Sequence, residues 1–242
     1  MNEQYNRSVG ISAETDLGLK SFMLGTYRYM AMAMGVTGLV AYFFGQYIQT
    51  NPQLMNLMFG NMFMAIAFVG GIMLAFGAIG RKLPTMSLGG VLAFLFGFAA
   101  FMGVFISPVS FMYNPQIIAK VFFMTVAMFA GLSMFGYTAK MDLGGIAKYA
   151  FIVFGAFVLV NILGMRFEMF RLSGPMDMIF TVVALGAIAI ITAFQTQTLK
   201  RIYYGAAGNT AMMSKLSAFG AASLLLTFIN MFQMLLSLFG RE

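Results

Sequence analysis

The 242-residue chain contains no cysteine, no histidine and no tryptophan. Without cysteine there is no disulfide and no thiolate nucleophile, and without histidine the commonest general base and metal ligand are missing. A Ser–His–Asp triad cannot be built, and zinc, haem and iron–sulfur sites have no plausible ligand set. We therefore expect no enzymatic activity, no catalytic residue, no cofactor and no metal site.

Charge is also scarce, since charged residues make up 9% of the chain against about 25% in an average soluble domain. Hydrophobic residues reach 61%, and the mean hydropathy is +0.88. A soluble domain of this size cannot bury that much apolar surface. Long unbroken apolar runs favour an all-α integral membrane fold over a β-barrel, whose strands alternate in polarity. The lipid bilayer is the expected partner and nucleic acid is not, because the net charge of +7 fits cationic loops on one membrane face.

Charged residues and Pro-containing turns divide the chain into seven apolar segments. The turns are marked by Asn51-Pro52, Ser107-Pro108 and Asn114-Pro115, which interrupt helices. A short polar N-terminal tail (1–19) precedes a single seven-helix transmembrane domain (20–240). Whether the seventh segment crosses fully or re-enters stays open, because it carries several polar side chains. The predicted transmembrane helices cover residues 21–45, 61–80, 86–106, 118–138, 146–166, 176–198 and 216–239.

The distribution of Lys and Arg predicts that the N-terminus is cytoplasmic. Cytoplasmic segments of membrane proteins are enriched in these residues. With seven spans and this orientation, ten basic residues lie inside: Arg7, Lys20, Arg28, Arg81, Lys82, Lys140, Lys148, Lys200, Arg201 and Lys215. Four lie outside or near the outer boundary: Lys120, Arg166, Arg171 and Arg241.

All seven acidic residues fall in tails, loops or helix ends. Transporters and proton relays usually place an ionisable group inside the bilayer, so this distribution argues against a charged transport pathway. The acidic residues are Glu3, Glu14, Asp16, Asp142, Glu168, Asp177 and Glu242.

Neutral polar residues do cluster inside two predicted spans. Thr192, Gln195 and Thr196 share one face of the sixth helix, and Ser223, Thr227 and Asn230 share one face of the seventh. One interpretation is hydrogen bonding between the helices. The other is a polar cavity lined by these six residues.

Several segments together resemble the Bax inhibitor-1 family, and within it the bacterial YccA-like branch. The strongest match is the turn at Gly136, Tyr137, Lys140 and Asp142, where the family reads close to G-Y-T-T-K-x-D-L. Span six ends in F-Q-T-Q at 194–197, where the family commonly has F-D-T-Q, and span seven contains L-T-F-I-N, where the family has L-D-F-I-N. The resemblance covers about residues 20–240 and implies six helices around a central seventh.

The departures from the family pattern concern two positions. The family's paired intramembrane aspartates, associated with pH-sensitive calcium leak, correspond to Gln195 and Thr227 here. Two adjacent carboxylates share a proton and offer anionic oxygens to calcium, whereas Gln and Thr do neither. We expect the two residues to form a permanently neutral hydrogen bond, and the acid-controlled switch to be lost.

Two functions follow from the resemblance. The first is an interaction or regulatory protein that modulates a membrane-anchored AAA protease or membrane homeostasis, with the N-terminal tail either a handle for the protease or an ordinary terminus. The alternative is a calcium-permeable leak channel without the di-aspartyl pH switch, with Ca²⁺ as its ligand; a purely structural subunit also stays open. The expected location is the bacterial cytoplasmic (inner) membrane.

Overall fold

The computed structural model describes residues 2–206 and 209–240, with side chains described from residue 17 onward. Within these ranges the chain is helical and contains no strand. Seven of its helices are long and apolar enough to cross a membrane, which confirms the predicted all-α membrane fold. The elements are α1 (Asn2–Gln49), α2 (Pro52–Phe59), α3 (Met62–Lys82), α4 (Leu88–Ile106), α5 (Val109–Met112), α6 (Pro115–Thr138), α7 (Gly144–Gly164), the 3-10 turn η1 (Glu168–Phe170), α8 (Pro175–Gly205) and α9 (Thr210–Phe239).

The predicted spans agree with the observed helices except at a few ends. The largest difference is the start of α1, at Asn2 instead of residue 21. The next largest are the C-terminal end of α8, which extends to Gly205 instead of residue 198, and the start of α9, at Thr210 instead of residue 216. The prediction followed the apolar stretch, whereas both helices continue past it through Lys200, Arg201 and Lys215. Two segments predicted as turns contain the short helices α2 and α5.

The first helix includes the segment that the sequence set apart as a tail. Its helical backbone begins at Asn2 and runs through to Gln49. The side chains of residues 2–16, among them Arg7, Glu14 and Asp16, lie outside the described residues, as do Arg241 and Glu242.

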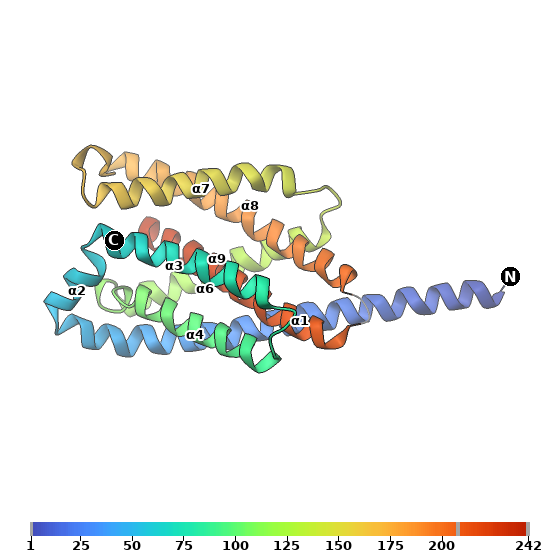
Figure 1. Cartoon of the computed structure of the whole chain (residues 1–242). Coiled ribbons are helices and arrows are strands. Elements are labelled where there is room, and N and C mark those ends of the chain that lie inside the picture. Colours follow the sequence, from blue (N-terminus) through green and yellow to red (C-terminus); the bar gives the residue numbers. More distant parts are fainter. Residues whose placement is uncertain (1, 207–208, 241–242) are drawn as a thin grey trace.

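The last helix, α9, lies at the centre of the bundle (Figure 1). It is the most deeply buried of the seven spans, and it contacts α1, α4, α6 and α8. Its small residues, including Ala218, Ala221 and Ala222, are fully buried, which permits close helix approach. Helix α7 packs on the outer side of α8. This confirms the predicted central position of the seventh span, around which α1, α4, α6 and α8 pack directly, while α7 packs against α8.

Helix α3 is held differently, because aromatic rings separate it from its neighbours. None of its residues is buried. Phe76 reaches Phe94 on α4 and Phe219 on α9 with ring centroids 5.5 and 5.6 Å apart, distances typical of favourable aromatic pairs. Its opposite face, with Phe63 and Leu74, is open to lipid.

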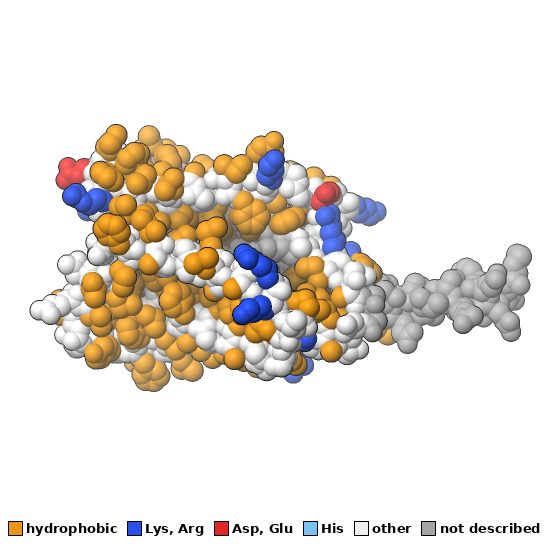
Figure 2. Space-filling view, in the orientation of Figure 1, with side chains coloured by type: hydrophobic (Ala, Val, Ile, Leu, Met, Phe, Trp, Pro, Cys, Tyr) orange, Lys and Arg blue, Asp and Glu red, His pale blue; other side chains and the backbone are white. Residues whose placement is uncertain are grey.

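The surface has the polarity expected of a membrane protein. Figure 2 shows hydrophobic side chains over the length of the bundle and most of the Lys and Arg side chains near the end from which α1 emerges. At that end lie the C-termini of α3, α6 and α8 and the N-termini of α7 and α9.

Candidate functional site

Helices α8 and α9 meet through a neutral polar contact between Gln195 and Thr227. The Thr227 hydroxyl donates to Gln195 Oε1 at 2.7 Å, and Gln195 Nε2 donates to Ser223 Oγ at 3.0 Å. Both ends of the Gln195 amide are therefore engaged by one neighbouring helix. We name these three side chains the amide contact.

The spacing of residues on α9 explains this geometry. Ser223 and Thr227 are four residues apart, so they lie one turn apart on the same face. The Thr227 hydroxyl also lies 3.2 Å from the carbonyl oxygen of Ser223, the residue one turn earlier. Thr227 is almost fully buried, and a buried hydroxyl needs such partners. The amide contact consists of groups that do not titrate near neutral pH.

The other predicted polar residues bond within their own helices. Thr192 donates to the Ile188 carbonyl at 2.8 Å, Thr196 to the Thr192 carbonyl at 3.2 Å, and Asn230 to the Leu226 carbonyl at 2.8 Å. The structure thus brings Gln195, Ser223 and Thr227 together and leaves these three outside that contact. A polar cavity lined by all six stays a prediction.

The turn between α6 and α7, which carries the family-like motif, lies against the end of α8. Gly136 is buried where a Cβ atom would collide with the backbone carbonyl oxygen of Ala193, so only glycine permits this approach. Lys200 on α8 donates to the Tyr137 carbonyl at 3.1 Å and lies 5.0 Å from the centre of the Tyr137 ring. Lys140 is exposed.

Gln197 fixes the backbone of this turn, a role that the sequence analysis missed. Its Oε1 accepts from the Leu143 amide at 3.0 Å, and its Nε2 donates to the Met141 carbonyl at 2.7 Å. Gln197 is buried, so it replaces water as the partner of these backbone groups. The available signal was its place at the end of the F-Q-T-Q motif.

Asp142 also attaches the turn between α6 and α7 to α8, through an ion pair with Arg201. Its Oδ1 accepts from the Gly144 amide at 2.9 Å and from Arg201 at 2.7 Å, and Arg201 also donates to Gln197 Oε1 at 3.1 Å. The Gly144 amide, followed by the Arg201 side chain, lowers the pKa of Asp142 below its usual value. We name Gln197, Lys200 and Arg201, with the turn that they hold, the α8 clasp.

Two further polar contacts hold α1 and were also missed. Thr26 Oγ1 lies 3.0 Å from Ser217 Oγ on α9, and Thr37 donates to the Ala99 carbonyl on α4 at 2.9 Å. At that crossing a Cβ on Gly103 would lie 2.6 Å from the Thr37 carbonyl oxygen. Neutral hydrogen bonds therefore join the central helix to both α1 and α8.

The described part of the chain offers little to a metal ion. Within it, no group of three or more His, Cys, Asp or Glu side chains lies together. The amide contact presents only neutral oxygens, which bind a divalent cation more weakly than carboxylates do. Its chemistry is hydrogen bonding without proton exchange.

Comparison with known proteins finds relatives of this chain among bacterial proteins. A family model described as "Inhibitor of apoptosis-promoting Bax1" matches residues 19–242. An uncharacterised protein of Caulobacter vibrioides is 31% identical over 253 residues, which cover 99% of this chain and 97% of the relative. The inner membrane protein YbhL of Escherichia coli is 28% identical, with 93% of each chain covered. An uncharacterised protein of Rickettsia prowazekii is 30% identical, with 94% of this chain and 92% of the relative covered.

Proposed function

Since the chain belongs to the Bax inhibitor-1 family of multi-pass membrane proteins, we propose that it is a non-enzymatic regulator of the bacterial inner membrane. Its task in this proposal is to bind and modulate another membrane protein, with a membrane-anchored AAA protease as the preferred partner. The observation that carries the proposal is the amide contact at Gln195 and Thr227, where the family resemblance implies a pair of aspartates.

The neutral contact argues against an acid-controlled ion pathway. Two adjacent carboxylates repel each other when both are ionised, and the pKa of one rises so that the pair responds to mild acid. Gln195 and Thr227 form the same hydrogen bond throughout this pH range. The sequence has no acidic residue between Asp16 and Asp142, so spans α3, α4 and α6 supply no substitute. A protein–protein role requires no such group.

We propose that the chain lies in the inner membrane with its N-terminus in the cytoplasm. Support comes from the gathering of Lys and Arg at the end from which α1 emerges (Figure 2) and from the inner-membrane relative YbhL. Cationic segments are retained on the cytoplasmic side during insertion. The α8 clasp then faces the cytoplasm, where a protease domain could contact it.

Calcium flux tests the choice between regulator and channel. The purified chain is reconstituted in liposomes, and flux is measured at mildly acidic and mildly alkaline pH beside the double variant Gln195→Asp with Thr227→Asp. A neutral variant, Gln195→Asn with Thr227→Ser, controls for altered packing. We expect no calcium flux above that of protein-free liposomes from the native chain or the neutral variant at either pH. Flux through the native chain, whether or not it responds to pH, would overturn the proposal and make the calcium-permeable leak the leading function.

Association with the protease is tested by deleting residues 2–18. The full chain and the deletion variant are expressed at equal levels, and their recovery with the membrane AAA protease and their half-lives are compared. We expect the full chain to co-purify with the protease and the deletion to lower both association and turnover. If the full chain shows no association, the protease is not its partner; if only the deletion has no effect, the contact lies elsewhere on the chain.

A further inference from the structure

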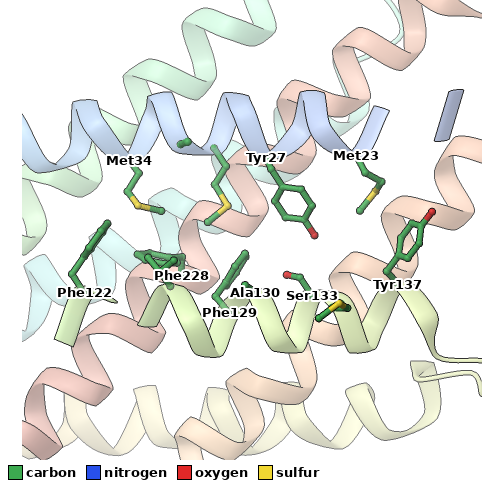
Figure 3. A pocket seen from close by; sticks show the side chains of 13 residues that line it. Met23, Tyr27, Met34, Phe122, Phe129, Ala130, Ser133, Tyr137 and Phe228 are labelled. Carbon is green, nitrogen blue, oxygen red and sulfur yellow. The ribbon is translucent and has the colours of Figure 1, made fainter. Parts of the chain in front are cut away.

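An apolar groove runs between α1 and α6, with α9 as its floor (Figure 3). Its volume is about 550 Å³, within the range of about 300–1,000 Å³ found for small-molecule pockets. Met23, Met30 and Met34 from α1 and Phe129 from α6 line the groove, and Phe228 from α9 lines its floor. Methionine side chains adapt to flexible apolar ligands.

A second cavity extends the groove towards the other membrane face. It measures about 400 Å³ and shares Met34, Phe122 and Phe228 with the first. The two together follow α6 from Tyr137 to Pro115, a distance of about 33 Å at 1.5 Å per residue. The groove is therefore as long as the hydrocarbon core is thick, about 30 Å.

One polar atom in the groove lacks a partner. Ser133 is 5% exposed, and its Oγ has no hydrogen-bond partner within the described residues. Figure 3 shows this hydroxyl and that of Tyr27 directed into the space between α1 and α6. A buried hydroxyl without an acceptor is unfavourable. An oxygen atom of a molecule bound in the groove would accept the missing hydrogen bond from Ser133.

The end of the groove beside Tyr137 is cationic. Tyr137 lies one helical turn, about 6 Å, beyond Ser133 on α6, and Lys200 lies over the Tyr137 ring. On α1 the lining residues Met23, Tyr27, Met30 and Met34 repeat at spacings of three and four, and Lys20 continues the same stripe. Lys20 is exposed, so it is available to an anionic group at the mouth.

The dimensions favour a single acyl chain over a protein helix. A 20-residue helix of about 10 Å diameter and 30 Å length fills roughly 2,400 Å³, several times the volume of either cavity. Both walls are membrane spans, so the groove opens into the surrounding lipid. In a phospholipid the ester carbonyl of the acyl chain lies close to the phosphate. This spacing matches the Ser133 hydroxyl, which lies one helical turn from the cationic end of the groove.

We propose that the groove between α1 and α6 binds one acyl chain of an anionic membrane phospholipid, whose ester carbonyl accepts a hydrogen bond from Ser133 and whose phosphate lies beside Lys20 and Lys200. The site shares no lining residue with the amide contact, so it goes beyond the proposed regulatory function. Its presence or absence is independent of whether the chain binds a protease or conducts calcium.

Photo-crosslinking tests the occupant. The full chain is placed in nanodiscs of phosphatidylglycerol that carries a diazirine in its acyl chain, and labelled residues are mapped. We expect labelling to concentrate on groove-lining residues of α1 and α6 and to be lost there in Ala130→Phe, which fills the groove. Ala127→Phe is the matched control, because Ala127 is exposed on the same helix and does not line the groove. Equal labelling of the groove and of the exposed face of α3, or no effect of Ala130→Phe, would overturn the proposal.

The Ser133→Ala variant tests the polar contact separately. In delipidated detergent we expect it to melt at the wild-type temperature or above, because an unpartnered hydroxyl is removed. The rise in Tm on adding phosphatidylglycerol should be smaller than for wild type, and Lys20→Gln should reduce the preference over phosphatidylcholine. A lower Tm without lipid would mean that Ser133 already has a protein partner, which contradicts the proposed carbonyl contact.

A second copy of the chain is the competing occupant. Because the chain has no cysteine, Ala130→Cys introduces a single thiol into the groove. We expect no disulfide-linked dimer in nanodiscs under mild oxidation. Efficient dimer formation would show that another chain covers the groove and would overturn the lipid assignment.

Discussion

Replacing Thr227 by valine removes one interhelical hydrogen bond and little else. Valine has nearly the shape of threonine, so the packing around α9 is retained. The lost hydroxyl donates to Gln195 Oε1 at 2.7 Å, while the bond from Gln195 Nε2 to Ser223 survives. Interhelical hydrogen bonds in membrane proteins contribute about 0.6 kcal/mol on average and up to about 1.7 kcal/mol. Since Thr227 is almost fully buried, we expect the free energy of unfolding to fall by about 1–1.7 kcal/mol.

The matched control is Thr192→Val on α8. Thr192 is also fully buried, but its hydroxyl bonds only to the Ile188 carbonyl of its own helix. This change should lower stability less than Thr227→Val does, because no hydrogen bond between helices is lost. Reversible unfolding in mixed micelles at neutral pH measures both variants, and a double-mutant cycle with Gln195→Leu isolates the pair.

Two outcomes would refute the reasoning about the amide contact. One is equal destabilisation by Thr227→Val and Thr192→Val, which would mean that loss of any buried hydroxyl has the same cost. The other is a coupling energy near zero between positions 195 and 227, which would mean that the bond contributes nothing to helix association.

The remaining predictions concern the α8 clasp and its surroundings. Gly136→Ala should lower the free energy of unfolding by about 1–3 kcal/mol, because the new methyl group meets the Ala193 backbone. Gly131→Ala, whose methyl group enters open space, should be neutral or stabilise by up to ~1 kcal/mol, and the unfolding midpoints of the two variants test this difference. Gln197→Leu leaves the Leu143 amide and the Met141 carbonyl unpaired, so hydrogen exchange and proteolysis at 139–143 should accelerate while α9 stays protected. Asp142→Asn removes the ion pair with Arg201. Because the fold lowers the pKa of Asp142 from 3.8, the Asp142 carboxylate stabilises the fold above pH 3.8, and this stabilisation is lost as the pH falls through the lowered pKa. The difference in Tm between wild type and Asp142→Asn should therefore be constant near neutral pH and vanish in strong acid; a difference that changes around pH 6–7 would contradict this assignment.

The seven spans could be predicted because lipid imposes a simple rule on sequence: about 20 apolar residues per crossing. The C-terminal end of α8 and the start of α9 could not be predicted in this way. Lys200 and Arg201 extend α8 beyond its apolar stretch, and Lys215 lies in α9 before its apolar stretch begins. Hydropathy measures where a helix enters lipid, whereas the helix itself ends where its backbone bonding ends.

Some residues of the site could likewise be predicted from the sequence and others could not. Helical periodicity placed Gln195 on one face of α8 and Thr227 on one face of α9, but only the family resemblance paired them. Gln197 could not be recognised from spacing, because it bonds a turn more than 50 residues away in sequence. Thr26 and Ser217, separated by 191 positions, were missed for the same reason. Helical periodicity in the sequence shows on which face of a helix a polar side chain lies, whereas its hydrogen-bond partner depends on the tertiary structure.

The central position of α9 has a consequence for biogenesis. It is synthesised after α1 to α8, yet it supplies the partners of Thr26 and Gln195. Until it inserts, the nascent bundle has an unfilled centre in which those groups lack the partners that they have in the finished fold. Insertion of α9 therefore completes the core, so a bundle without α9 differs from the complete one at its very middle, where Thr26 and Gln195 lack these partners.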